Sequence, residues 1–123
     1  MRKQAVKQEF ENTSMELARE ALAKNIARWT AEDGPLVTAI PGLLLSRRSA
    51  PTQPMSTMYE PSICLVSQGG KRVLLGDDTY VFDVHHFLIT SVDIPTVVQV
   101  INASWEKPCL SLLLKLDNAR FHS

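Results

Sequence analysis

The chain has no excess of charge of either sign. Its 123 residues contain 13 Lys and Arg and 13 Asp and Glu, so the formal net charge is zero. Proteins that bind nucleic acid by themselves draw most of their affinity from basic residues that neutralise phosphates. The neutral, scattered charge therefore argues against tight DNA binding by this chain alone, and it does not indicate a strongly acidic partner either.

The sequence also lacks long apolar runs and is poor in cysteine. Runs such as Leu43–Leu45 and Leu112–Leu114 are far shorter than the roughly 20 residues that a membrane-spanning helix needs. The first residues contain no apolar stretch of the kind found in a secretory signal, so we expect a cytoplasmic protein without a membrane partner. The two cysteines, Cys64 and Cys109, are then expected to stay reduced.

One helix is predicted after a polar segment, residues 1–12, that we expect to be flexible. Thr13 and Glu16 fit a capping box, and Asp33-Gly34-Pro35 is a typical helix stop. Apolar residues between them recur at spacings of three and four, which predicts one buried stripe: Met15, Ala18, Leu22, Ile26 and Trp29. Charged residues nearby predict a solvated outer face: Glu16, Arg19, Glu20 and Lys24.

After Pro35 the sequence has the pattern of short strands separated by turn residues. Gly69-Gly70 is expected to close one hairpin and Val84–His86 another, whereas the segment with Pro51 and Pro54 is expected to be a loop. Roughly eight strands at regular spacing predict a mainly β sandwich or barrel. The expected strands are residues 36–40, 43–49, 62–68, 71–75, 79–83, 87–91, 96–103 and 109–116.

No catalytic constellation is predicted. His85 and His86 are adjacent, and adjacent strand residues point to opposite faces, so the pair cannot share one metal ion. The third histidine, His122, lies in the tail, and no acidic residue stands at a convincing ligand spacing. Gly69-Gly70-Lys71 lacks the first glycine and the Ser or Thr of a phosphate-binding loop. We therefore expect no catalytic residue, no metal and no cofactor.

Polar residues inside the predicted strands are the candidates for a ligand pocket, because pockets are mostly apolar with a few placed polar groups. Alternation allows residues such as Arg72 and Thr90 to face either a pocket or solvent. The cysteines are equally typical of buried core positions. As a hypothesis, the predicted ligand-binding residues are Cys64, Tyr80, His86 and Gln99.

Residues 15–117, nearly the whole chain, resemble the N-terminal domain of a group of AraC-type bacterial transcriptional regulators. The similarity lies in residues 40–47, 59–69, 71–77, 80–83 and 87–95 and continues into residues 106–116. The resemblance implies a cupin-like β-barrel or jelly roll of about eight strands preceded by one N-terminal α-helix. It also implies a domain that senses an effector and often mediates dimerisation, but it fixes no binding residue.

The resemblance further implies a DNA-binding half with two helix-turn-helix motifs, which this sequence lacks. We therefore expect residues 13–117 to form the sensing domain, residues 118–123 to be a polar tail, and the chain to be truncated before its DNA-binding half. The expected partners are an unidentified small-molecule effector and a second copy of the chain. Although we expect no enzyme, two alternatives stay open: a stand-alone cupin-type isomerase or dioxygenase, and an assembly module without a ligand.

Overall fold

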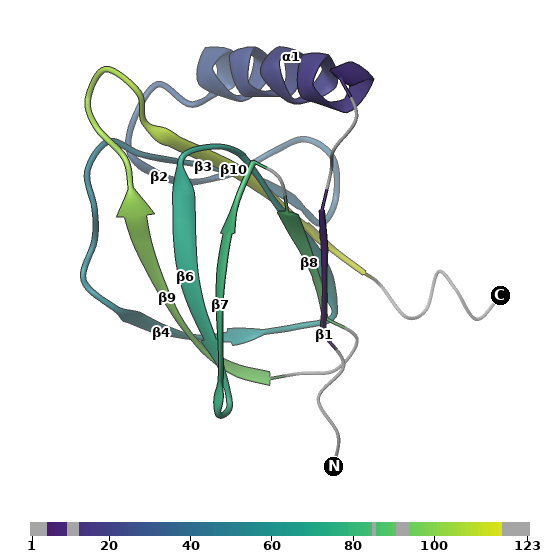
Figure 1. Ribbon diagram of the computed structural model, residues 1–123. Coiled ribbons are helices and arrows are strands. Elements are labelled where there is room, and N and C mark those ends of the chain that lie inside the picture. The colour runs from purple at the N-terminus through teal and green to yellow at the C-terminus, as the bar shows by residue number, and fades with distance from the viewer. Residues whose placement is uncertain (1–4, 10–12, 85, 91–93, 117–123) are drawn as a thin grey trace, which may run out of the picture.

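Two antiparallel β-sheets face each other, and one helix lies on the outer side of the larger sheet (Figure 1). The computed structural model describes residues 5–9, 13–84, 86–90 and 94–116. In the six-stranded sheet the strands lie in the order β1 (Ala5–Glu9), β8 (His86–Thr90), β5 (Ser62–Gln68), β10 (Cys109–Lys115), β3 (Leu43–Arg48) and β2 (Gly34–Val37). In the four-stranded sheet the order is β4 (Met55–Tyr59), β9 (Ile94–Asn102), β6 (Gly70–Leu75) and β7 (Asp78–Asp83).

This architecture confirms the expected fold class as a mainly β, jelly-roll-like fold of two antiparallel sheets with one α-helix near its N-terminus. The space between the two sheets is filled by apolar side chains of both, because alternate residues of each strand point inward. We call this cluster the inter-sheet core. Its buried members include Cys64, Val66, Val73, Leu75, Phe82, Leu88, Val100 and Cys109. No helix of the described residues is long and apolar enough to cross a membrane.

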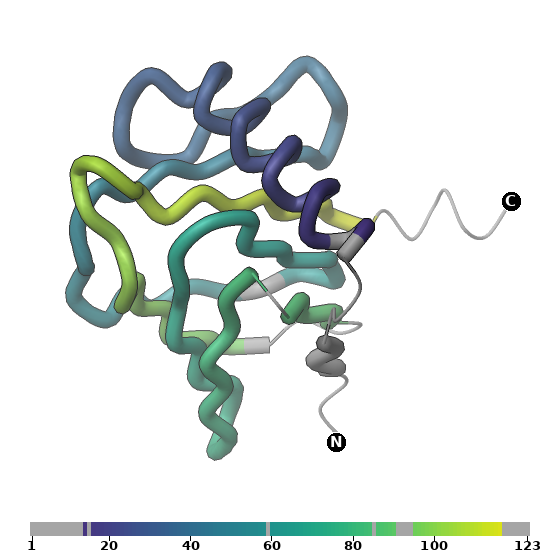
Figure 2. Tube along the Cα trace, turned by 45° about the horizontal axis from the view of Figure 1, so that its top comes forward, coloured from purple at the N-terminus to yellow at the C-terminus, as the bar shows by residue number. Residues whose placement is uncertain are grey.

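The helix α1 (Thr13–Trp29) packs on the outer face of the six-stranded sheet, over β3, β5 and β10 (Figures 1 and 2). Its span confirms the predicted helix, but the predicted faces are partly wrong. Ala18 and Trp29 are exposed, and Arg19, expected in solvent, is only 7% exposed. The buried face follows Arg19, Ala23 and Ile26, and so it is rotated by about one residue from the predicted stripe.

A polar contact ties the C-terminal end of the helix to the sheet. Arg47 on β3 donates from Nη2 to the carbonyl of Ala27 (3.2 Å) and from Nε to the hydroxyl of Thr30 (3.4 Å). A guanidinium is favoured there, because the last carbonyls of a helix carry partial negative charge. Thr30 is buried at this contact, whereas Trp29 is 68% exposed.

The chain changes sheets at both places where the sequence predicts a hairpin, and those two predictions are wrong. β5 pairs with β8 and β10, whereas β6 pairs with β7 and β9. Similarly, β7 and β8 lie in different sheets. Gly69 makes the first crossing possible: its φ is +89°, and a Cβ there would lie 2.5 Å from the carbonyl oxygen of Asn102. At Gly42 and Gly76, by contrast, the chain turns back between strands that pair with each other, β2 with β3 and β6 with β7.

Two strands were not predicted. β1 pairs with β8 along five residues and lies inside the segment that we expected to be flexible, so that expectation is corrected for Ala5–Glu9. β4 pairs with β9 and follows Pro54 directly, at an edge of the four-stranded sheet where proline nearby is tolerated. The predicted tail, residues 118–123, lies outside the described residues.

Candidate functional site

A lysine faces the inter-sheet core. β6 lies inside the four-stranded sheet, where Val73 and Leu75 are fully buried between the sheets. Lys71 precedes them with the same alternation, and its neighbours in register, Phe82 and Val100, are also buried core residues. Alternation therefore directs the Lys71 side chain inward, away from solvent.

The Lys71 amine bridges the two sheets. Its Nζ donates a hydrogen bond of 2.9 Å to the hydroxyl oxygen of Ser111, which is buried on β10 of the opposite sheet. Ser111 in turn lies opposite Ser46 on β3 and next to Val66 on β5. A polar contact thus joins the sheets inside an otherwise apolar core.

A cavity of about 160 Å³ adjoins this contact. We call it the inter-sheet cavity. Besides Lys71 and Ser111, inward side chains of both sheets line it, among them Leu44, Cys64, Val66, Phe82 and Leu113. A mostly apolar lining with one charged group and two serines, Ser46 and Ser111, is the composition that small-molecule pockets use.

Burial dominates the electrostatics of the cavity. Loss of water around Lys71 lowers the pKa of its amine, the thiols of Cys109 and Cys64 oppose that change, and nearby Arg48 adds to it. Burial likewise raises the pKa of the Cys109 thiol, although Lys71 and the amide of Gly70 act in the other direction. Cys109 therefore stays a neutral thiol at neutral pH and does not neutralise Lys71.

The four predicted ligand-binding residues do not form one site. Cys64 lines the inter-sheet cavity, and Tyr80 packs against the inter-sheet core. His86 lies away from the cavity lining, with Nδ1 3.0 Å from Oδ1 of Asp83. Gln99 alternates with the inward-facing Val98 and Val100, so it faces outward, away from the inter-sheet cavity, and its role in ligand binding stays a prediction. Its Oε1 accepts a 3.4 Å hydrogen bond from Arg72.

Sequence analysis missed Lys71 and Ser111. The signal for Lys71 was its alternation with Val73 and Leu75, which places it on the buried face of the strand. A lysine in that pattern was considered only as part of a phosphate-binding loop. The partner, Ser111, is 40 residues away, and no local pattern links the two.

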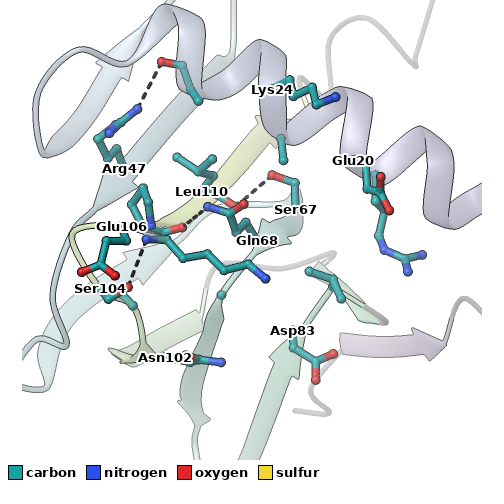
Figure 3. A pocket seen from close by; sticks show the side chains of 18 of the residues that line it. Glu20, Lys24, Arg47, Ser67, Gln68, Asp83, Asn102, Ser104, Glu106 and Leu110 are labelled. Carbon is teal, nitrogen blue, oxygen red and sulfur yellow. Dashed lines mark hydrogen bonds between the residues drawn. The ribbon is translucent and has the colours of Figure 1, made fainter.

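A second, larger hollow of about 870 Å³ lies between α1 and the segment around residues 102–108 (Figure 3). We call it the helix groove. Several polar groups that line it already bind protein partners: Ser67 donates to the carbonyl of Leu110, Gln68 to that of Pro108, and Arg47 to that of Ala27. Exposed charges of both signs make up much of the rest, including Glu20, Lys24 and Glu106. The first two contacts join β5 to β10 and the residue before it, and the third joins β3 to the helix. Because these polar groups already have protein partners, we consider the inter-sheet cavity the better candidate site.

Neither the histidines nor the cysteines form a metal cluster within the described ranges, where no three His, Cys, Asp or Glu side chains are placed to hold one ion. His85 lies outside the described residues. Cys64 and Cys109 are both buried and both free thiols.

These features define a class: a jelly-roll-like domain of two sheets, with a polar contact and a cavity between them and a helix on its outer face. The chain belongs to the family of AraC-type transcriptional regulator N-termini, whose family model matches residues 39–123. That match covers well over half of the sequence and confirms the resemblance inferred from the sequence.

The other comparisons add little. Among curated proteins, none matches the chain. A solved structure with a similar arrangement is a variant of salicylate 1,2-dioxygenase from Pseudoaminobacter salicylatoxidans in complex with gentisate, at 10% identity and a TM-score of 0.38. The match covers 85% of the present chain but 33% of the dioxygenase chain.

Proposed function

We propose that this chain is the effector-sensing domain of an AraC-type transcriptional regulator, and that a small molecule binds in its inter-sheet cavity. Membership of the family supports the regulatory role. The observation that carries the binding site is the Lys71–Ser111 contact beside an apolar cavity. The zero net charge is in keeping with DNA binding by a part of the regulator other than this sequence.

The strand β10 contacts the cavity on one face and α1 on the other, so it can couple the two. Ser111 and Leu113 line the inter-sheet cavity, whereas Leu110, on the opposite face, is buried in a cluster with Ala23 and Ile26 of α1. An effector that favours one arrangement of β10 would therefore change how α1 packs. Such a coupling requires only that the effector binds two arrangements with unequal affinity.

Binding in the cavity is testable with benzene as a neutral probe, because an apolar cavity of about 150 Å³ in another protein takes this molecule. We expect benzene to shift the methyl NMR signals of Leu44, Val66 and Leu113. The methyl groups of Val37, which is 78% exposed, are the internal control and should not move. Shifts confined to exposed methyl groups would contradict the proposed site.

The proposal includes a homodimer and a cytoplasmic location. Sedimentation equilibrium tests the dimer: a mass near 13.7 kDa over the whole concentration range would contradict it. A stand-alone isomerase or dioxygenase is the alternative, and its metal-dependent version predicts stoichiometric metal in the protein purified without chelators. Elemental analysis tests that version, because a metal-free, folded protein would count against it.

A further inference from the structure

The lining of the inter-sheet cavity contains one basic residue and no acidic one among the described residues. Lys71 faces inward, and Arg48, at the end of β3, lies in register with the buried Cys109. Among the described residues that line the inter-sheet cavity, Lys71 is the charged one, and none is Asp or Glu. Arg48 also acts on the exposed carboxylate of Asp33, whereas the groups that shift the pKa of Lys71 include no carboxylate.

The Lys71 amine has donor capacity that the described protein groups do not use. An ammonium group has three N–H donors, and Ser111 accepts one of them. Buried cations are normally balanced by an anion, because an uncompensated charge is costly in an apolar environment. The two thiols beside Lys71 are poor substitutes, because burial keeps Cys109 protonated.

We propose that the inter-sheet cavity selects a small carboxylate with an apolar tail, whose carboxylate group binds Lys71 and whose tail lies among Leu44, Val66, Phe82 and Leu113. This inference rests on the proposed function and names the chemical class of the effector. The cavity of about 160 Å³ sets the size of the tail at roughly four to seven carbon atoms, since a comparable cavity accepts benzene.

Matched acid and alcohol pairs test the charge directly. We would titrate the protein calorimetrically with pentanoate and pentan-1-ol, and with benzoate and benzyl alcohol, because each pair shares a tail and differs in the head group. We expect each carboxylate to bind about 10- to 100-fold more tightly than its alcohol, the range for a hydrogen bond to a charged group. Binding should also take up protons from the buffer, because an anion beside Lys71 favours its charged form.

Two variants assign the effect to Lys71. In Lys71→Met the carboxylates should lose about 10- to 100-fold in affinity while the alcohols change by less than about threefold. Lys107→Met, at an exposed lysine in the helix groove, is the matched control and should leave both affinities unchanged. If Lys71→Met does not fold, the comparison of acid with alcohol in the wild-type protein decides the question alone.

The outcomes separate the two proposals. Equal affinities for acid and alcohol in the wild-type protein would overturn the carboxylate inference and leave the cavity as a neutral binding site. Equal losses in Lys71→Met and Lys107→Met would also overturn it, because they would indicate binding to the surface. If neither the acids, the alcohols nor benzene bind, the proposed function of the cavity fails together with the inference.

Discussion

The two sheets differ in how many of their faces are covered. The six-stranded sheet has the inter-sheet core on one face and α1 on the other, whereas no helix of the described residues covers the outer face of the four-stranded sheet. There Leu74 and Val81 remain 37% and 46% exposed. The sequences follow this difference. Leu43–Leu45 and Leu112–Leu114 are continuous apolar runs in the doubly covered sheet, whereas β6 alternates between inward and outward residues.

This difference indicates where each kind of function resides. A strand with two buried faces, such as β10, transmits a change on one face to whatever packs on the other. A strand with one buried face, such as β6, can present a single polar group inward without losing its apolar contacts, as Lys71 does between Gly70 and Val73. In the proposed sensing, Lys71 of the four-stranded sheet contacts the effector, and β10 of the six-stranded sheet transmits the change to α1.

The largest expected loss of stability comes from a substitution at Gly69, where the chain crosses from one sheet to the other. In Gly69→Ala the new methyl group would lie 2.9 Å from Cα of Cys109 and closer still to the carbonyl of Asn102, at a φ of +89°. We expect a loss of about 4 kcal/mol in the free energy of unfolding, from left-handed strain and overpacking together. Gly34→Ala, with a φ of +118° and open space around the new Cβ, isolates the strain and should cost far less. Urea unfolding of both variants measures the difference, and similar losses would contradict the packing argument.

Two leucine substitutions test the difference between the outer face that α1 covers and the outer face of the four-stranded sheet. Leu110, 1% exposed beneath α1, should cost about 3 kcal/mol when replaced by Ala, the usual penalty for a cavity in a core. Leu74→Ala, on the outer face of the four-stranded sheet, should cost less than about 1 kcal/mol. Chemical denaturation of the two variants gives both values. Equal losses would show that the helix adds little to the burial of the larger sheet.

Local pattern was sufficient for most strands but not for their pairing. Residues 62–68 were predicted with their observed bounds, because turn signals flank a run rich in apolar residues. Gly69-Gly70 permits a hairpin or a crossing equally well, and the choice is made by β5 pairing with β10, about 40 residues away. The edge strands β1 and β4 have weak local signals, and their pairing with β8 and β9 is equally non-local.

The candidate site was predictable only in part for the same reason. Cys64 stands in an apolar strand and lines the inter-sheet cavity, whereas the alternation of Gln99 with Val98 and Val100 already indicates that it faces away from this cavity. The charge of Lys71 favours a solvent-facing position in any local prediction. What holds it inside is Ser111 on the opposite sheet, a contact that requires the tertiary structure.

Removing the buried amine gives an intermediate effect that depends on pH. Because burial lowers the pKa of Lys71 from its ordinary 10.5, the unfolded chain binds more protons than the folded one between the two pKa values, so stability rises with pH there. The Lys71→Met variant lacks the amine, so it lacks this contribution to the rise of stability with pH. We expect its advantage over the wild-type protein to be largest below the lowered pKa and to shrink toward pH 10.5. Urea unfolding from pH 7 to 10 measures it, with Lys107→Met as the control, and a difference independent of pH would contradict the assignment.

The smallest expected effect lies at the exposed edge of the doubly covered sheet, where β2 begins. Asp33 accepts hydrogen bonds from the Ser49 hydroxyl (2.7 Å) and amide (2.9 Å), which together lower the pKa of the carboxyl below 3.8. Ser49→Ala removes the first of these, so the pKa of Asp33 should move up toward 3.8. A carboxyl with a lowered pKa stabilises the fold above its unfolded pKa and loses this effect as the pH falls through the folded value. Because the group is exposed, solvent screening limits the loss at pH 7 to less than about 0.5 kcal/mol, and it should vanish in strong acid. An NMR titration of the Asp33 carboxyl measures the shift directly; an unchanged pKa would mean that the amide of Ser49 alone holds this edge.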